Sequence, residues 1–565
     1  MIKKKYLISS VFLSAVLAAG MIAGCGSTTS GTGSSSNVGS STAAATKTSV
    51  TTSTTVKAAD ISYDEDDKNE AWSADDATNI TLKDSSAKID GSNVKESDGV
   101  ITINNSGTYV ISGTLSDGEI VIDAGSNDVV HIVLNGANIT SSAGAVINGT
   151  QSGKIILTLA DGTENTLTDG TSYSDLDEDE EPDAAIFSKD DITVNGSGTL
   201  NVKGNYKNGI HGKDGVKIIN GTINVDAANH AVSGKDYIAV SGGTLNLTSA
   251  EDALHSSTDV QVSDGKITIN AGDDAIHADS TVTIDGGTIQ VDQSNEGIEG
   301  TVVNINNGDI SVTSSDDGIN GSDGLTDDST DTTDTPSASD GKDARGGGMG
   351  GGMENDENVL VTINGGKLYI NAEGDSIDSN GNLSITGGET VIDGTVRGGN
   401  GILDYNGTGV ITGGTLIGVG TSDMAQSFSD TSTQYSLLYG FDSSQSAGTK
   451  VSLKDSSGNE VISTTAAKSF QAVVISSPNL KKDETYSLYT GDTKVEDVTL
   501  DSVNTTSGNI NQGGPMGGPG QGGGPGQDQG GGPGQDQDGG PGQNQGGSPG
   551  GPNQGKDSGE KEQKQ

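Results

Sequence analysis

Apolar and polar residues alternate through the middle of the chain. Val282 and Ile284 precede the turn DGG, and Ile289 and Val291 follow it. An alternation with a period of two is the pattern of a β-strand with one buried face. The neighbouring stretches repeat the pattern with Val260, Val262, Ile267 and Ile269 before it, and with Val303, Ile305, Ile310 and Val312 after it. The sequence therefore predicts short strands on both sides of a recurring glycine turn.

This unit repeats about every 22 residues. The Gly of motifs such as GTL, GTI and GKI falls at positions 198, 221, 243, 265, 287 and 308, with spacings of 23, 22, 22, 22 and 21, and resumes at 366, 388 and 414. A further aliphatic column consists of Ile210, Val232, Leu254, Ile276, Ile298, Ile319 and Ile377. Five aliphatic columns at this period predict an all-β fold, a right-handed parallel β-helix with three short strands in each of about a dozen coils.

Changes in composition predict the division of the chain. Residues 1–25 are expected to be a lipoprotein signal peptide, 26–59 a flexible Ser/Thr-rich stalk, 60–430 the β-helix, 431–506 a small antiparallel β cap, and 507–565 a disordered Gly/Pro/Gln-rich tail. Within the β-helix, the Gly-rich stretch 322–357 interrupts the repeat and is expected to be a flexible loop that leaves one coil. The cap is predicted because the open end of a β-helix exposes strand edges.

The first residues indicate export. Three lysines precede an apolar run that ends in IAGC, which resembles the bacterial lipobox, and Cys25 is the only cysteine of the chain. The prediction is lipidation of Cys25 and a position on the extracellular face of the bacterial cell membrane. The tail is a candidate for contact with the cell wall, and the protein is expected to be a monomer.

The charge is strongly acidic, with a formal net charge of −48. Such a chain repels nucleic acid, so that no nucleic-acid partner is expected. Trp72 is the only tryptophan and lies outside the repeats, so that stacking of sugars on aromatic platforms is not the expected mode of binding.

Acid pairs recur at one position of the repeat. Stacked coils about 4.8 Å apart would align them in two columns, formed by Glu251, Asp252, Asp273, Asp274, Asn295, Glu296, Asp316 and Asp317. Neighbouring carboxylates at that spacing repel each other, and Ca²⁺ is the cation that clustered side-chain oxygens prefer. The sequence therefore predicts Ca²⁺ along the columns, and the alternative is a row of turn acids in water.

Two further groups are weaker candidates. The acids Asp175, Asp177, Asp179 and Asp183 precede the regular coils and could surround a cation. Three histidines, His211, His255 and His277, share one column, while His230 occupies an acid position. Zinc needs three or four convergent nitrogen or sulfur ligands, and the simpler expectation is that the first three histidines are outward-facing spacers.

The order of motifs resembles a known family. The succession AAIFSKDDITVNGSGTLNVKGNYKNGIHGKDGVKI, DDAIHADSTVTIDGGTI, NEGIEGTVVNINNGDI and SDDGIN, followed by the cap, is similar to the β-helical carbohydrate-binding proteins on the surface of clostridia and their relatives. This resemblance implies a pectate-lyase-like fold, Ca²⁺ binding, and binding of cellulose or polygalacturonate without an established catalytic activity. The chain departs from the family pattern in the longer acidic loop near residue 180 and at His230.

Three classes of function stay open. The first is a polysaccharide-binding surface lipoprotein, with cellulose or acidic pectin-like polymers as ligands. The second is a polysaccharide lyase or glycoside hydrolase, although only Arg397 of the two arginines, Arg345 and Arg397, lies near a coil, and carboxylate spacing alone does not exclude a hydrolase. The third is a structural adhesin or matrix protein in which Ca²⁺ only stiffens a stalk.

Overall fold

The computed structural model describes residues 61–91, 93–174, 176–177, 179–323 and 355–510. The expected signal peptide with Cys25, the stalk, Asp175, nearly all of the 322–357 insertion with Arg345, and the tail beyond residue 510 lie outside these residues. The described residues contain strands and no helix, and therefore no helix that could cross a membrane.

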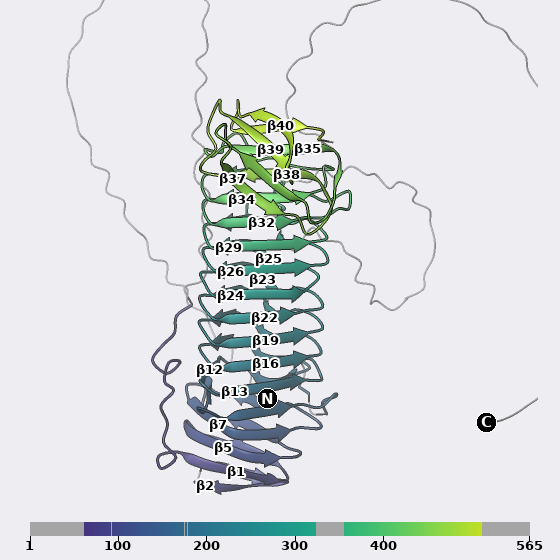
Figure 1. Cartoon of the computed structure of the whole chain (residues 1–565). Helices are drawn as coiled ribbons and strands as arrows, with labels where there is room; N and C mark the ends of the chain where they lie inside the picture. The colour runs from purple at the N-terminus through teal and green to yellow at the C-terminus, as the bar shows by residue number, and fades with distance from the viewer. Residues whose placement is uncertain (1–60, 92, 175, 178, 324–354, 511–565) are drawn as a thin grey trace, which may run out of the picture. The chain divides into compact units, whose positions relative to one another are not determined.

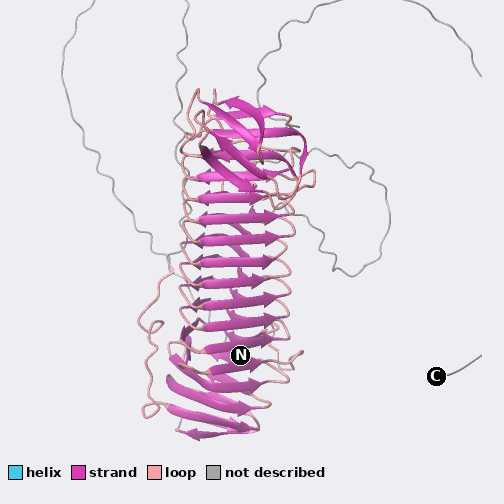
Figure 2. Cartoon of the chain, viewed as in Figure 1, coloured by secondary structure: helices cyan, strands magenta, loops and turns pink. Residues whose placement is uncertain are grey.

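A parallel β-helix forms the body of the described part of the chain, as the periodicity predicts (Figures 1 and 2). Each coil places one strand in each of three parallel sheets, because the strand of one coil pairs with the equivalent strand of the next. Sheet I contains β13 (Thr199–Gly204), β16 (Thr222–Ala227), β19 (Thr244–Ser249), β22 (Lys266–Asn270), β24 (Thr288–Gln293), β26 (Asp309–Ser314), β29 (Lys367–Ala372), β32 (Glu389–Asp393) and β34 (Thr415–Gly420).

The other two sheets follow the same register. Sheet II contains β11 (Ala184–Ser188), β14 (Asn208–Gly212), β17 (Val232–Gly234), β20 (Leu254–Ser256), the first halves of β23 (Ile276–Ile284) and β25 (Ile298–Ile305), β27 (Ile319–Gly321) and β30 (Asp378–Ser379). Sheet III contains β12 (Ile192–Gly196), β15 (Gly215–Ile218), β18 (Tyr237–Val240), β21 (Asp259–Val262), the second halves of β23 and β25, β28 (Leu360–Ile363), β31 (Asn382–Ile385) and β33 (Gly409–Ile411).

Earlier strands extend the helix toward the N-terminus. They are β4 (Val100–Ile103), β5 (Gly107–Leu115), β6 (Glu119–Asp123), β7 (Val129–Thr140), β8 (Ile147–Gln151), β9 (Lys154–Leu159) and β10 (Glu164–Thr168). At this end β1 (Thr78–Asp84) pairs antiparallel with β2 (Ser86–Asp90), and β3 (Val94–Ser97) pairs antiparallel with β4. The sequence did not predict these antiparallel pairings.

The predicted C-terminal cap is confirmed. The strand β38 (Phe470–Ser476) lies antiparallel between β34 and β35 (Ser436–Gln445), and β41 (Asn504–Gly508) pairs with β35, so that the last edge of sheet I is covered. A separate antiparallel sheet contains β37 (Glu460–Thr465), β36 (Lys450–Lys454), β39 (Thr485–Thr490) and β40 (Thr493–Thr499). Aromatic residues pack in this cap, with Tyr439, Phe441 and Phe470 in edge-to-face contacts.

The core is the set of aliphatic columns that the alternation predicts. Val282, Ile284 and Val291 are fully buried, Ile289 is 1% exposed, and Ile276 and Ile298 of the next column are fully buried as well. The alternating polar residues point outward, so that sheet formation and core formation use the same period of two.

The glycine that marks the repeat has a conformational cause. Gly243, Gly265 and Gly287 have φ angles of +85°, +117° and +87°, a region that residues with a Cβ atom rarely adopt. A Cβ atom added to Gly287 would also lie 2.9 Å from the carbonyl oxygen of Gly265 in the preceding coil. The turn therefore needs Gly for its backbone angle and for the close stacking of coils.

Gly287→Ala is expected to destabilise the protein more than Gly458→Ala. Gly458 has a similar φ of +84°, but nothing lies within 4 Å of its added Cβ atom, so that both variants incur about 1–2 kcal/mol of backbone strain and only Gly287→Ala adds a steric contact. Thermal unfolding of both variants measures the difference. Equal losses would show that coil stacking does not restrict this turn.

Candidate functional site

The acid pairs lie in the turns that lead from sheet I into sheet II. Backbone hydrogen bonds connect the positions of the second pair members in successive coils. The amide of the residue that follows each such position donates to the carbonyl oxygen of the second pair member in the next coil. These bonds run from Ala231 to Asp252, Ala253 to Asp274, Ala275 to Glu296, Gly297 to Asp317 and Gly318 to Asp375, at 2.9–3.1 Å. The predicted stacking of the acids is therefore present.

The two columns differ in exposure. Glu251, Asp273, Asn295 and Asp316 form an outer column, in which the three acids are exposed. Asp252, Asp274, Glu296 and Asp317 form an inner column, in which Asp252 and Asp274 are each only 5% exposed. The inner column therefore carries most of the desolvated charge, a distinction that the sequence did not make.

A third column faces the inner one and was not predicted as part of the site. Each of its residues lies three positions after an inner-column residue or after Asp375. The column consists, in register, of His255, His277, Glu299, Asn320 and Asp378. The expectation that His255 and His277 are mere outward spacers is wrong, because their Nδ1 atoms lie 2.7 Å and 2.9 Å from carboxylate oxygens of Asp252 and Asp274. The recurrent acid-x-x-polar spacing is the signal in the sequence that marks this facing column.

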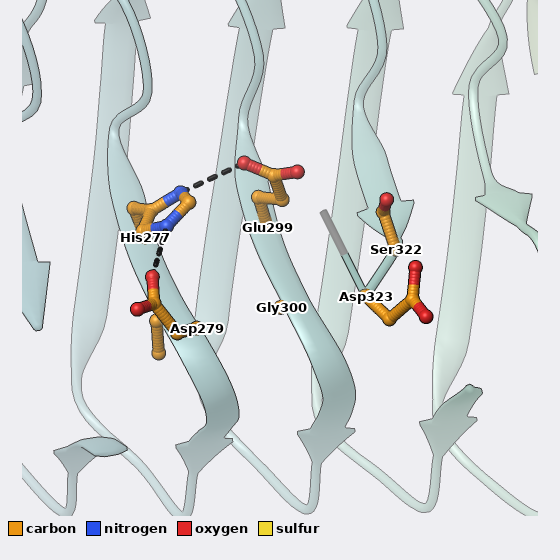
Figure 3. Close-up of a pocket in the computed structure, with 7 residues that line it drawn as sticks. His277, Asp279, Glu299, Gly300, Ser322 and Asp323 are labelled. Atoms are coloured by element: carbon orange, nitrogen blue, oxygen red, sulfur yellow. Dashed lines mark hydrogen bonds and ion pairs between the residues drawn. The ribbon is translucent and has the colours of Figure 1, made fainter. Parts of the chain in front are cut away.

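Histidines compensate the acids in the N-terminal half of the columns. His277 Nδ1 also lies 2.7 Å from Glu299 Oε2, and its Nε2 lies 3.1 Å from Asp279 Oδ1 (Figure 3). Burial lowers the pKa of His277, but the hydrogen bonds with Asp274 and Glu299 outweigh burial and raise the pKa to about 11. This imidazole lowers the pKa of Glu299, whereas burial and Glu299 raise the pKa of Asp274 to about 9.

The C-terminal half has no such base. Asp317, Asp375 and Asp378, here called the uncompensated acid cluster, form no ion pair with any lysine, arginine or histidine of the described residues. Burial and the neighbouring carboxylates raise the pKa of Asp317 to about 9, that of Asp378 to about 8 and that of Asp375 to about 7. Three carboxyl groups here thus resist ionisation at neutral pH.

Asn320 adds a buried acceptor without a donor. Its Nδ2 atom donates to Glu296 Oε2 at 2.9 Å, whereas its Oδ1 atom is buried without a hydrogen-bond partner. Asn320 is 6% exposed and pairs in register with Asp378. Buried polar atoms almost always have a partner, and an oxygen-only environment of carboxylates and an amide carbonyl fits a hard cation such as Ca²⁺.

The sequence missed Asp375 and Asp378 for a definite reason. Asp375-Ser376-Ile377 repeats the pattern of Asp317-Gly318-Ile319. The insertion separates these two coils by 58 residues instead of 22, and the amide of Asp375 still donates to Asp317 Oδ1 at 2.6 Å. The aliphatic column at Ile377 was recognised across the gap, but the acids beside it were not.

The weaker acidic candidate is divided in the structure. Asp177 accepts from Lys189 Nζ at 2.6 Å, while Asp183 contacts His211 Nδ1 at 2.6 Å. Glu181, which the sequence did not single out, pairs with Lys213 and lies close to Asp177 and Asp179. Lysines thus already compensate much of this loop.

Two hollows open beside the facing column. One of about 300 Å³ is lined by His277, Asp279, Glu299 and Ser322 (Figure 3). The other, of about 520 Å³, includes Lys207, Asn229, His230, Lys235 and His255 in its wall. The exposed Arg397 forms no ion pair with a described residue and does not line either hollow.

Residues 97–344 match the family model described as carbohydrate-binding domain-containing protein. This part of the chain belongs to that family. The resemblance noted in the motifs is thereby confirmed, and the matched region of this carbohydrate-binding domain includes all eight predicted column residues but ends before Asp375.

Two known proteins are similar to parts of this chain. A carbohydrate-binding domain-containing protein of Acetivibrio thermocellus is 41% identical over 140 residues, which are 25% of this chain and 48% of that relative. The chain thus spans about half the length of this relative. A solved structure of a polysaccharide lyase-like protein from C. thermocellum, a gadolinium derivative, shares 33% identity over 40% of this chain and 96% of that one, with a TM-score of 0.36.

Proposed function

We propose that this protein binds an extracellular polysaccharide through a Ca²⁺-loaded face of its β-helix. The observation that carries the proposal is the uncompensated acid cluster beside the orphaned Oδ1 atom of Asn320, in a chain whose family is carbohydrate-binding. Bound Ca²⁺ would supply positive charge to an acidic surface. The lipobox-like IAGC supports a lipid anchor at Cys25 and a position outside the cell membrane.

Asp317, Asp375, Asp378 and Asn320 are proposed as ligands of a Ca²⁺ ion, and Asp274, Glu296 and Glu299, whose ligand atoms lie within 4.8 Å of one another, are a second oxygen-only group. The first four residues all offer oxygen, and no described base competes for their three carboxylates. The predicted ligand Asp252 has a histidine partner that holds its pKa low despite burial, and it therefore needs a cation less, whereas burial and Glu299 raise the pKa of Asp274 to about 9 despite its contact with His277. Ligation by the eight column residues stays a prediction.

The polymer class follows from the charge and from the aromatic content. Trp72 is half-buried against Val110, Val133 and Ala160 and offers no open platform for a sugar ring. A uronate polymer needs a cation to approach a surface of this charge, whereas a neutral glucan such as cellulose needs only hydrogen bonds. Binding of acidic pectin-like polymers should therefore depend on Ca²⁺.

Retention on immobilised polygalacturonate is expected in Ca²⁺ and is expected to be lost in chelator. Retention on cellulose should survive the chelator, because no charge has to be bridged. Asp317→Asn should weaken retention on polygalacturonate, whereas Asp264→Asn, at an exposed turn outside the columns, should not.

The same experiment tests the alternatives. New ultraviolet absorbance from unsaturated products would indicate a lyase instead of a binding protein. Stabilisation by Ca²⁺ without retention on either polymer would favour a structural stalk. Retention on polygalacturonate that is unchanged by the chelator would contradict the proposed role of Ca²⁺.

A further inference from the structure

Two histidines and one aspartate converge at the N-terminal end of the inner column. His230 Nδ1 lies 3.4 Å and His255 Nδ1 lies 2.7 Å from the same atom, Asp252 Oδ2. The two imidazole rings are stacked at 4.2 Å with an interplanar angle of 11°, and the ligand atoms of the three residues all lie within 4.8 Å of one another. His230 occupies the position that Asp252, Asp274 and Asp317 hold in later coils, and its substitution for an acid creates this arrangement.

The contact between His230 and Asp252 would be stabilised by a cation. The backbone amide of Asp252 donates to His230 Nδ1 at 3.3 Å, so that this nitrogen carries a lone pair and not a proton. Its 3.4 Å contact with Asp252 Oδ2 then places two electron-rich atoms against each other. A positive ion that both atoms can ligate would turn this repulsion into attraction.

We propose that His230, Asp252 and His255 bind a divalent transition-metal ion of the zinc type. Imidazole nitrogen suits Zn²⁺, Ni²⁺ and Cu²⁺ and does not suit Ca²⁺, which takes oxygen ligands. Metal–ligand bonds of about 2.0–2.1 Å in tetrahedral geometry separate ligand atoms by about 3.3 Å. The His230 contact has this separation, and His255 needs to move outward by a few tenths of an ångström.

The site has an open side. His230 and His255 line the larger hollow, whose wall also carries Asn229, Lys207 and Lys235. Three protein ligands leave the fourth position of a tetrahedral ion available, and this position can hold water or an oxygen of a bound sugar. The inference goes beyond the proposed function and does not depend on it, because it requires neither the uncompensated acid cluster nor Ca²⁺.

Calorimetric titration of the full chain with ZnCl₂ tests the proposal. The protein carries no polyhistidine tag, and the buffer contains excess Ca²⁺ so that oxygen-only sites are already occupied. One Zn²⁺ per chain is expected. His255→Ala should weaken its affinity by at least about 10- to 100-fold, and Co²⁺ in place of Zn²⁺ should give visible absorption of a four-coordinate ion.

Two variants make the test specific. His230→Asp introduces the residue that later coils carry at this position, so that the fold is retained, and it should reduce Zn²⁺ affinity by a similar factor. His211→Gln changes a histidine of the same sheet whose partner is Asp183, and it should leave Zn²⁺ affinity unchanged. Absence of Zn²⁺ binding, or equal binding by wild type and by His230→Asp and His255→Ala, would overturn the proposal.

Discussion

Asp67→Ala is expected to lower the free energy of unfolding by about 3–5 kcal/mol, because it leaves buried lysines without their carboxylate partner. Asp67 is fully buried, and its carboxylate oxygens lie 2.8 Å from Lys154 Nζ and 3.0 Å from Lys217 Nζ. Thr193 donates a further bond of 2.7 Å. Burial raises the pKa of Asp67, but these hydrogen bonds outweigh burial and lower the pKa to about 2.

In this variant the N-terminal arm, defined as residues 61–76, should unfold before the coils do. Lys154 retains Asp64 at 2.6 Å, whereas Lys217 loses its only ion-pair partner among the described residues. Because Trp72 is the only tryptophan, its fluorescence reports the arm, and far-ultraviolet circular dichroism reports the strands.

Urea unfolding followed by both signals measures the effect. In Asp67→Ala the tryptophan transition should occur at lower urea than the dichroism transition. Asp66→Ala changes an exposed neighbour and should leave both transitions in place. If both transitions of Asp67→Ala occur at the same urea concentrations as those of wild type, this buried ion pair does not hold the arm on the β-helix.

Asp317→Asn is expected to change stability in opposite directions with and without Ca²⁺. Burial and the neighbouring acids raise the pKa of Asp317 to about 9. A carboxyl group whose pKa is raised in the folded state adds stability that is complete below its unfolded pKa of about 3.9 and is lost as the pH rises through the folded value. In chelator, wild type should therefore lose stability between pH 6 and pH 9, and the asparagine variant should lose less.

Ca²⁺ should reverse this order. At 100 times its dissociation constant a ligand stabilises the folded state by about 2.7 kcal/mol, and the variant lacks one of the charged oxygens that bind it. His277, with a pKa near 11, also loses stabilising protonation as the pH rises, so the comparison between wild type and variant isolates the contribution of Asp317. Thermal unfolding of wild type and of Asp317→Asn at pH 8, each in Ca²⁺ and in chelator, gives the four unfolding temperatures that the comparison needs.

Asp316→Asn provides the matched control. Asp316 precedes Asp317 in the chain but belongs to the exposed outer column. Because Asp316 is exposed, its replacement should change stability less than Asp317→Asn does in either buffer. If Asp317→Asn destabilises the protein equally in both buffers, the carboxylate has a structural role that is independent of Ca²⁺.

The β-helix was predictable because local chemistry repeats. The positive φ of Gly243, Gly265 and Gly287 requires glycine, and the alternation around Val282 and Ile289 determines which side chains are buried. Both signals recur from coil to coil, so that a departure at one position does not hide the period. The stacking of the acids follows from the same register.

The rest of the site depends on contacts that no period encodes. The exposure of Asp273 and the burial of Asp274 arise from the path of the turn, although the two residues are adjacent in sequence. Asp67 reaches Lys217 across 150 positions of sequence, and the insertion places Asp378 beside Asn320. Such pairings require the three-dimensional fold, and sequence spacing alone does not reveal them.

A crystal structure of the protein grown at pH 8 in excess Ca²⁺ tests the central claim most directly. An anomalous scatterer is expected within about 2.3–2.6 Å of Asn320 Oδ1 and of carboxylate oxygens from the uncompensated acid cluster. A crystal with no ion at this position, in which a water molecule or a carboxyl proton satisfies Asn320 Oδ1, would contradict this claim.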